Sequence, residues 1–177
     1  LHEFDAFTEN NSQYIDVVNN KRLCGYGVWP GISHNRGYHI NPCWGGHLDL
    51  FRIPKFSYYF MQSQQDREKV GDVLYIASWW TEMSPPDVTV YSNAEKVRLY
   101  IDGKLIGEQF PDDVRVSHPP FTFRDVKRKY KGRNRSVLRA EALVNGETVA
   151  EKSVKAPGVA TRLMLKADYE GISLKAD

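Results

Sequence analysis

The sequence has few cysteines, almost no net charge and no long apolar segment, and each absence excludes a class of protein. Two cysteines among 177 residues, Cys24 and Cys43, can form one bridge at most, so this is not a disulfide scaffold. Lys and Arg outnumber Asp and Glu by only 24 to 22, too weak a bias to indicate nucleic-acid binding. No apolar run approaches the roughly 20 residues that a membrane span needs, so we expect no such span.

The two ends of the sequence lack the marks of a complete protein. Leu1 is not an initiator Met, and no charged and then apolar signal segment follows it. The sequence stops at Asp177 within a strand-like pattern. We therefore expect a piece of a longer protein, whose compartment cannot be read from these residues.

Aromatic residues, by contrast, are abundant. They make up 12% of the chain, and exposed rings are typical of carbohydrate sites and protein interfaces. With 41% hydrophobic residues, the chain is also able to bury the core of one domain or of two small ones.

Residues 1–66 have the pattern of an α/β unit. Residues 2–19 are weakly helical, and residues 23–29 form a short apolar run without alternation, which favours a strand buried on both faces. A polar and aromatic loop follows over 30–48, and residues 54–64 predict a second helix, with its proline in the first turn. This order is typical of an α/β barrel or a doubly wound sheet.

Residues 67–157 change to the rhythm of a β-sandwich. Alternating apolar residues and two hairpin signals, Asp102-Gly103 and Asn145-Gly146, predict an immunoglobulin-like fold. The expected strands lie within 72–80, 88–91, 96–101, 138–142 and 148–154. Residues 158–177 read as a linker and the start of a further strand pattern.

Four segments carry a resemblance to a known family. Trp29–Tyr38, which includes Trp29-Pro30 and His34-Asn35-Arg36, and the segment Asp49–Gln64 resemble glycoside hydrolase family 2, the β-galactosidase group. In that family this pattern marks the eighth barrel strand, the loop after it and the final barrel helix. Val90–Lys104 is similar to the opening of the sandwich domain that follows the barrel, and Leu165–Ile172 to the start of the next sandwich.

The resemblance implies a mainly β fragment, with an immunoglobulin-like β-sandwich preceded by the last α/β unit of a truncated TIM barrel. Residues 1–66 would be the seventh helix, eighth strand, loop and eighth helix of the barrel. Residues 67–157 would be the sandwich, and 158–177 a linker and the start of another sandwich.

The resemblance also implies a function for the parent protein. It would be a bacterial, periplasmic or secreted enzyme that hydrolyses terminal β-galactosides or related β-glycosides with retention, without a cofactor. Its partners would be the carbohydrate, bound through the intact barrel, and the neighbouring domains of the same chain, but neither nucleic acid nor membrane. The run Ile32-Ser33-His34 stands where many relatives carry an aromatic-acidic-aromatic run, so the particular sugar is not implied.

The candidate substrate-binding residues are Trp29, His34, Asn35 and Arg36. Trp29 ends the predicted barrel strand, where barrel enzymes place their active sites, so its ring could be a platform for a sugar or a packed core residue. In the family the matching Trp lines the sugar subsite, and the matching Trp-Pro bond is often cis. The three polar residues lie on the following loop, where they could bind sugar hydroxyls or cap the loop's own carbonyls.

No residue of this chain is predicted to be catalytic. A retaining glycosidase needs two carboxyl groups, and in the family these are glutamates on barrel strands four and seven, upstream of this chain. Glu3 is the one rival, and its position suits a glutamate in a first helical turn. The fragment alone is therefore expected to be inactive.

No metal site is predicted. Zinc sites use closely spaced Cys or His pairs, and only two pairs, His34 with His39 and Cys43 with His47, come near that spacing. Structural histidines and a buried cysteine are the simpler interpretation.

Two further features have competing interpretations. The basic run over 127–135 could track phosphates, but a solvated edge hairpin is favoured because aspartates lie nearby in sequence. The sandwich could also be a non-catalytic module that binds carbohydrate through exposed Trp79 and Trp80, or a purely structural spacer.

Overall fold

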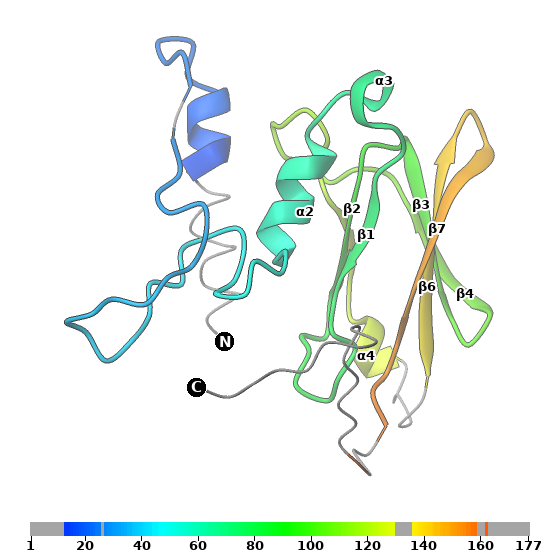
Figure 1. Cartoon of the computed structure of the whole chain (residues 1–177). Helices are drawn as coiled ribbons and strands as arrows, with labels where there is room; N and C mark the ends of the chain where they lie inside the picture. Colours follow the sequence, from blue (N-terminus) through cyan, green and yellow to red (C-terminus); the bar gives the residue numbers. More distant parts are fainter. Residues whose placement is uncertain (1–12, 26, 130–135, 159–161, 163–177) are drawn as a thin grey trace, which may run out of the picture.

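The computed structural model describes residues 13–25, 27–129, 136–158 and 162. It is mainly β, with two antiparallel sheets stacked face to face and a helix packed against the outside of one of them (Figure 1). The predicted fold class is confirmed for the sandwich. Predictions that fall on Glu3, on Leu165–Ile172 and on residues 130–135 lie outside the described residues.

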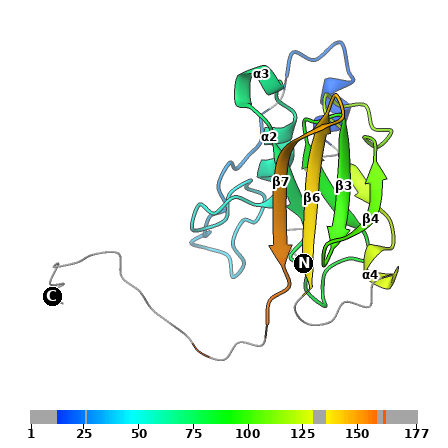
Figure 2. The ribbon, with the colours of Figure 1, turned by 90° about the vertical axis from the view of Figure 1, so that its right-hand side faces the viewer.

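The two sheets have three and four strands. The smaller has the order β1-β2-β5, and the larger has the order β4-β3-β6-β7, which Figure 2 shows face on. The strands are β1 Leu74–Ala77, β2 Val88–Ser92, β3 Lys96–Ile101, β4 Lys104–Gln109, β5 Phe121–Phe123, β6 Val137–Val144 and β7 Glu147–Lys155. All pairs of neighbouring strands are antiparallel, as an immunoglobulin-like sandwich requires.

The core lies between the two sheets and follows the alternation in the sequence. In β3 every second residue is buried, and Val97, Leu99 and Ile101 are fully covered. They meet Val90 of β2 and Leu138 of β6 in one apolar cluster. Alternating residues of a strand point to opposite faces, so this register fixes which face of β3 meets the opposite sheet.

Both predicted hairpin turns are present. Asp102 and Gly103 join β3 to β4 with φ of 49° and 79°, and Asn145 and Gly146 join β6 to β7 with φ of 51° and 82°. Two consecutive positive φ values are the geometry of the type I′ turn, which Asp-Gly and Asn-Gly favour.

Strand β5 was not among the sequence predictions. It has three residues, too few for an alternating pattern to be recognised. It exists because Phe121 and Phe123 pair with Val90 and Val88 of β2, a contact between residues more than 30 positions apart in the sequence. Such a strand is set by its partner rather than by its own residues.

Helix α2, Phe56–Ser63, confirms the predicted helix and covers the outer face of the smaller sheet (Figure 1). Phe60 packs edge-on against Tyr91 of β2, with ring centroids 5.6 Å apart. Tyr59 stacks on Tyr75 of β1 at 3.6 Å. Strand β2 is thus covered on both faces, with α2 on one side and the larger sheet on the other.

The segment 23–29 corrects one sequence prediction. Its described residues form no strand, although an apolar run without alternation predicts one. A strand needs hydrogen bonds from a neighbouring strand, and none of the described segments pairs with these residues. Of the helix expected over 2–19, residues 13–18 are helical and 1–12 lie outside the described part.

Two smaller predictions are also corrected. Helix α2 begins at Phe56 with Lys55 as N-cap, so Pro54 precedes the helix instead of lying in its first turn. The start of the basic run is helical rather than a hairpin, because Val126–Lys129 form α4. Lys127 donates hydrogen bonds to the carbonyls of Thr81 and Ser84, at 3.0 and 2.9 Å, so it holds a loop of the sandwich.

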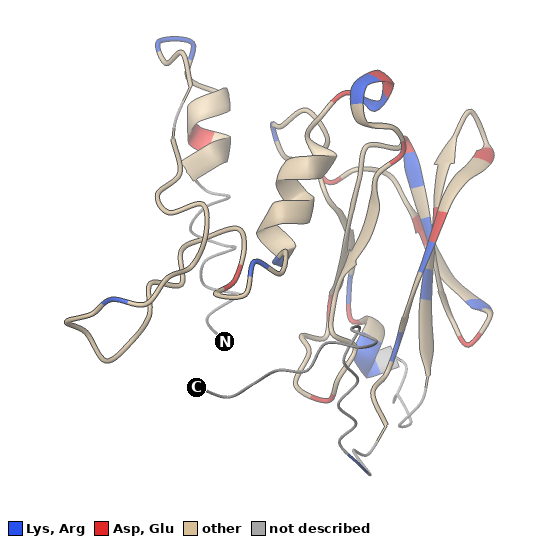
Figure 3. Ribbon diagram, viewed as in Figure 1, with Lys and Arg blue, Asp and Glu red and all other residues tan. Residues whose placement is uncertain are grey.

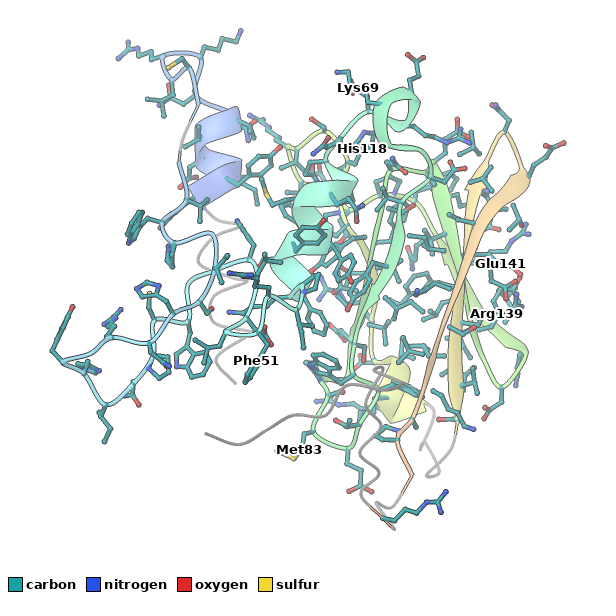
Figure 4. The ribbon with its side chains drawn as sticks, viewed as in Figure 1. Phe51, Lys69, Met83, His118, Arg139 and Glu141 are labelled. Carbon is teal, nitrogen blue, oxygen red and sulfur yellow. The ribbon has the colours of Figure 1, made fainter. Side chains whose placement is uncertain are left out.

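The strands of the larger sheet carry charged residues of both signs (Figure 3). Arg139 and Glu141 lie on β6, on the side away from α2 (Figure 4), where they form an ion pair with each other. Glu141 also accepts a hydrogen bond from the hydroxyl of Tyr100 at 2.8 Å, and Arg139 lies 4.0 Å from the Tyr100 ring centroid. This mixed and mutually paired surface is typical of a solvated sheet face.

Candidate functional site: the loop before helix α2

The candidate site lies in the loop that joins residue 29 to α2. Two strips of this loop lie side by side, because His34 and Cys43 exchange both backbone hydrogen bonds, at 3.1 and 2.8 Å. Ser33 donates its backbone N–H to the carbonyl of Leu48 at 2.9 Å, which adds a second tie. A long loop without helix or strand is thereby held in one shape by its own backbone.

Gly46 is required by the closeness of these two strips. A Cβ at this position would lie 2.3 Å from the backbone nitrogen of Ser33 and 2.5 Å from the carbonyl carbon of Ile32. No side chain fits there without displacement of backbone atoms. The glycine therefore allows the strip over 43–48 to pass against the strip over 31–34.

Trp29 is presented to solvent rather than packed in a core. Its side chain is 89% exposed, and its bond to Pro30 is cis, as the resemblance predicted. A Cβ built on Gly45 would lie 3.4 Å from the Cδ of Pro30. The Trp29-Pro30 bond therefore lies close to the strip over 43–48. Within the described residues, the Trp29 ring is therefore not part of a packed core.

His34, Asn35 and Arg36 are also exposed. Together with Trp29 they make up the exposed rim of the loop. A hydrogen bond from the Arg36 side chain to Cys43 lowers the pKa of the Cys43 thiol, and the backbone N–H of Gly45 acts in the same direction. The same contact raises the pKa of Arg36. The structure thus brings three of the four candidates, Trp29, His34 and Arg36, to the strip that contains Cys43 and Gly45, with Asn35 exposed between them.

Sequence reasoning missed Lys55, which holds the base of this loop. Lys55 is only 6% exposed, and its Nζ donates hydrogen bonds to Ser33 Oγ at 2.8 Å and to the Trp44 carbonyl at 2.7 Å. The neighbouring His47 has its pKa lowered by burial and by the charge of Lys55. A lysine directly before a helix, where a cation is disfavoured, was the signal that could have indicated it.

The cysteines and histidines do not assemble a metal site in the described part of the chain. No group of three His, Cys, Asp or Glu side chains there is placed to hold an ion. Cys24 and Cys43 are both free thiols, the first exposed and the second half-buried, so neither is the fully buried cysteine of the simpler interpretation. Among the described residues, no helix is long and apolar enough to cross a membrane.

A separate open groove of about 640 Å³ lies between residues 15–22 and 113–115. Asn19 donates a hydrogen bond to the Arg115 carbonyl at 2.7 Å across it. None of the candidate binding residues lines this groove.

The tryptophans of the sandwich do not form the carbohydrate platform that one interpretation required. Trp80 is 5% exposed, because its backbone takes a φ of 50° and its ring turns into the core, where Nε1 donates to Ser136 Oγ at 2.9 Å. Trp79 is 57% exposed, but its ring lies 5.2 Å from that of Phe56 of α2. A binding module built on this pair is therefore wrong as far as Trp80 is concerned.

The fold is similar to that of parts of solved glycosidases. A β-glucuronidase from glycoside hydrolase family 2 has a TM-score of 0.64 at 18% identity, over 88% of this chain and 16% of its own. A calcium-binding mutant of β-glucuronidase 2 from Bacteroides uniformis has a TM-score of 0.65 at 22% identity, over 86% of this chain and 18% of its own. At these identities the likeness shows the fold.

The sequence comparisons agree. A β-galactosidase of Thermoanaerobacter pseudethanolicus (strain ATCC 33223 / 39E) is 30% identical over 161 residues, which cover 82% of this chain and 22% of that protein. Residues 84–150 match the family described as Domain of unknown function (DUF4982). The resemblance to glycoside hydrolase family 2 is confirmed, and the chain spans about a fifth of the length of the curated relative that it matches.

Proposed function

We propose that this chain is part of a family 2 glycosidase that hydrolyses terminal β-galactosides, or related β-glycosides, with retention of configuration. The observation that carries the proposal is the 30% identity to a β-galactosidase, because a match over 82% of the chain extends well beyond the sandwich into the segment with the candidate loop. The two catalytic glutamates would lie on parts of the enzyme upstream of these residues.

The geometry of the loop supports a sugar-binding role. Trp29 offers an exposed apolar ring, and sugars stack their apolar face on such rings. On the following loop, Asn35 and Arg36 offer exposed hydrogen-bond donors suited to hydroxyl groups. One aromatic surface beside a few convergent polar groups is the usual composition of a small-molecule site.

The test is hydrolysis by the full-length protein. We expect it to cleave an aryl β-galactoside or an aryl β-glucuronide, with the β-anomer as the first product in a proton NMR time course. Residues 1–177 alone should show no turnover. Failure to cleave either glycoside, or an inverted first product, would overturn the proposal.

We also propose that the parent protein is bacterial and periplasmic or secreted, a location that follows from the resemblance alone. Fractionation of the source cell would test it. Activity confined to the cytoplasm would contradict it.

A further inference from the structure

Lys55 stands in an unfavourable electrostatic position. It is the N-cap residue of α2, where the positive end of the helix dipole repels a cation, and only 6% of it is exposed. Burial of a charged group costs free energy unless hydrogen bonds compensate for lost water. The sequence therefore keeps a lysine where a neutral capping residue such as Ser or Asn would favour the helix more.

The compensating hydrogen bonds join two separate strips of the candidate loop. One acceptor, Ser33 Oγ, lies 22 positions before Lys55, and the other, the Trp44 carbonyl, lies 11 positions before it. Ser33 is itself 2% exposed, so this contact is shielded from water. The backbone N–H of Lys55 adds a third tie, to the His47 carbonyl at 3.0 Å.

Each acceptor is the immediate neighbour of a residue at the exposed rim. Ser33 precedes His34, and Trp44 follows Cys43, the residue that pairs with His34 through the backbone and holds the Arg36 side chain. A shift of either strip therefore moves His34 and Arg36 relative to Trp29. These contacts connect Lys55 to the residues beside His34 and Cys43.

We propose that Lys55 is the positioning residue of the sugar-binding loop, whose buried ammonium group holds the strips containing Ser33 and Trp44 at the spacing that the rim requires. The inference rests on the proposed function, because it assigns Lys55 to the same site. Lys55 itself does not contact the sugar. It stabilises the shape of the loop through its buried hydrogen bonds to Ser33 and Trp44.

The first experiment compares Lys55→Met with Lys69→Met in the full-length enzyme. The first change keeps the aliphatic length but removes the ammonium group. The second does the same to a side chain that is 73% exposed on the short helix α3, Arg67–Val70. We expect kcat/KM of Lys55→Met to fall about tenfold or more, with kcat reduced in the folded enzyme, since small misplacements of bound groups are costly to rate. Lys69→Met should match the unsubstituted enzyme.

A double-mutant cycle separates positioning from a general loss of folding. Ser33→Ala removes one acceptor and is the milder change. It should lower kcat/KM by several-fold in the unsubstituted enzyme but have little further effect once Lys55→Met is present, because both changes break the same contact. Equal effects of Ser33→Ala in both backgrounds would contradict the inference.

Amide hydrogen exchange tests the tie without any substrate. The amides of His34 and Cys43 should exchange faster in Lys55→Met than in Lys69→Met, while those of the sandwich stay protected. Unchanged exchange, or an unchanged kcat/KM in Lys55→Met, would overturn the inference even if the enzyme is a glycosidase. If the unsubstituted protein cleaves no glycoside but the exchange changes as expected, the proposed function fails, and the role of Lys55 in sugar binding fails with it.

Discussion

Single side chains decide what the candidate loop presents to solvent and what it buries. Trp29 is exposed although it belongs to an apolar run, and Lys55 is buried although it is charged. Both placements oppose the usual preference of the residue type. A residue whose burial departs from the usual burial of its type is more informative about a site than a residue with the usual burial.

Trp29 gives the most direct prediction at this scale. In the full-length enzyme, Trp29→Ala should lower kcat/KM by roughly two orders of magnitude, about 2.7 kcal/mol of transition-state stabilisation, because it removes the platform and loosens the reacting centre. The melting temperature should change little, since the ring is exposed. Steady-state kinetics and thermal unfolding of the same purified variant measure both.

Arg36→Ala is the matched comparison for that variant. It lies on the same rim but off the aromatic platform, so its effect should be smaller and act mainly through KM. A Trp29→Ala enzyme with normal kcat/KM and a normal fold would refute the platform.

Asp87 gives a prediction on pH. The backbone N–H of Asp125 donates a hydrogen bond to the Asp87 carboxyl at 2.8 Å and lowers its pKa. Partial burial raises this pKa, and the Arg124 side chain, which donates a hydrogen bond to Asp87, lowers it further. A lowered folded-state pKa means that the stabilisation is complete above the unfolded pKa, about 3.9, and is lost as the pH falls through the folded value. The gap in melting temperature between residues 1–177 and their Asp87→Asn variant should therefore be largest near neutral pH and shrink below about pH 4.

Arg124→Gln serves as the control for this experiment. It leaves the hydrogen bond from Asp125 in place, and that bond is the largest cause of the lowered pKa. Most of the pH dependence should remain in this variant. A gap between wild type and Asp87→Asn that stays constant down to pH 2 would contradict the assignment.

At the scale of elements, α2 is the joint between the candidate loop and the sandwich. Its aromatic side packs on β1 and β2, and Gln64 after its last turn exchanges hydrogen bonds with the backbone of His118 at 2.7 and 3.1 Å. Its other end is the N-cap Lys55. Helix α2 thus connects the candidate loop to the sandwich and sets its position there.

Phe60 tests that joint. Phe60 is 3% exposed and contacts both Tyr91 and Tyr14, so Phe60→Ala should lower the free energy of unfolding of residues 1–177 by about 3–5 kcal/mol. Urea unfolding followed by circular dichroism measures it. Tyr58→Ala, on a side chain of the same helix that is 39% exposed, should cost much less, and equal costs would contradict the packing described.

At the scale of the whole molecule, the two parts differ in what they can bury alone. The sandwich has a closed core of residues from both sheets, whereas residues 1–66 have no sheet among their described residues. We predict that residues 67–157 unfold in one cooperative thermal transition and that residues 1–66 show none. Residues 55–157 should melt at a higher temperature than 67–157, because α2 then still covers Tyr75 and Tyr91.

Calorimetry of the three fragments measures these transitions. A sharp transition in residues 1–66 would show that they fold without the sandwich. A melting temperature for 55–157 no higher than for 67–157 would show that α2 adds nothing to it.

The sequence by itself determined the features that depend on neighbours in the chain. The turns at Asp102-Gly103 and Asn145-Gly146 need only residues that tolerate positive φ, and the alternation in β3 needs only a face that is apolar. The resemblance to glycosidases likewise depends on local motifs. These signals are short-ranged, so they can be read without the fold.

The tertiary structure alone decided the features that depend on distant partners. Residues 23–29 look like a strand, but none of the described segments pairs with them, while Phe121–Phe123 become a strand because β2 lies beside them. Trp80 is buried because Ser136, 56 positions away, accepts its N–H, and Lys55 is buried because two strips of a loop supply its acceptors. Pairing and burial are satisfied by groups far apart in sequence, and a pattern of adjacent residues contains no record of which groups those are.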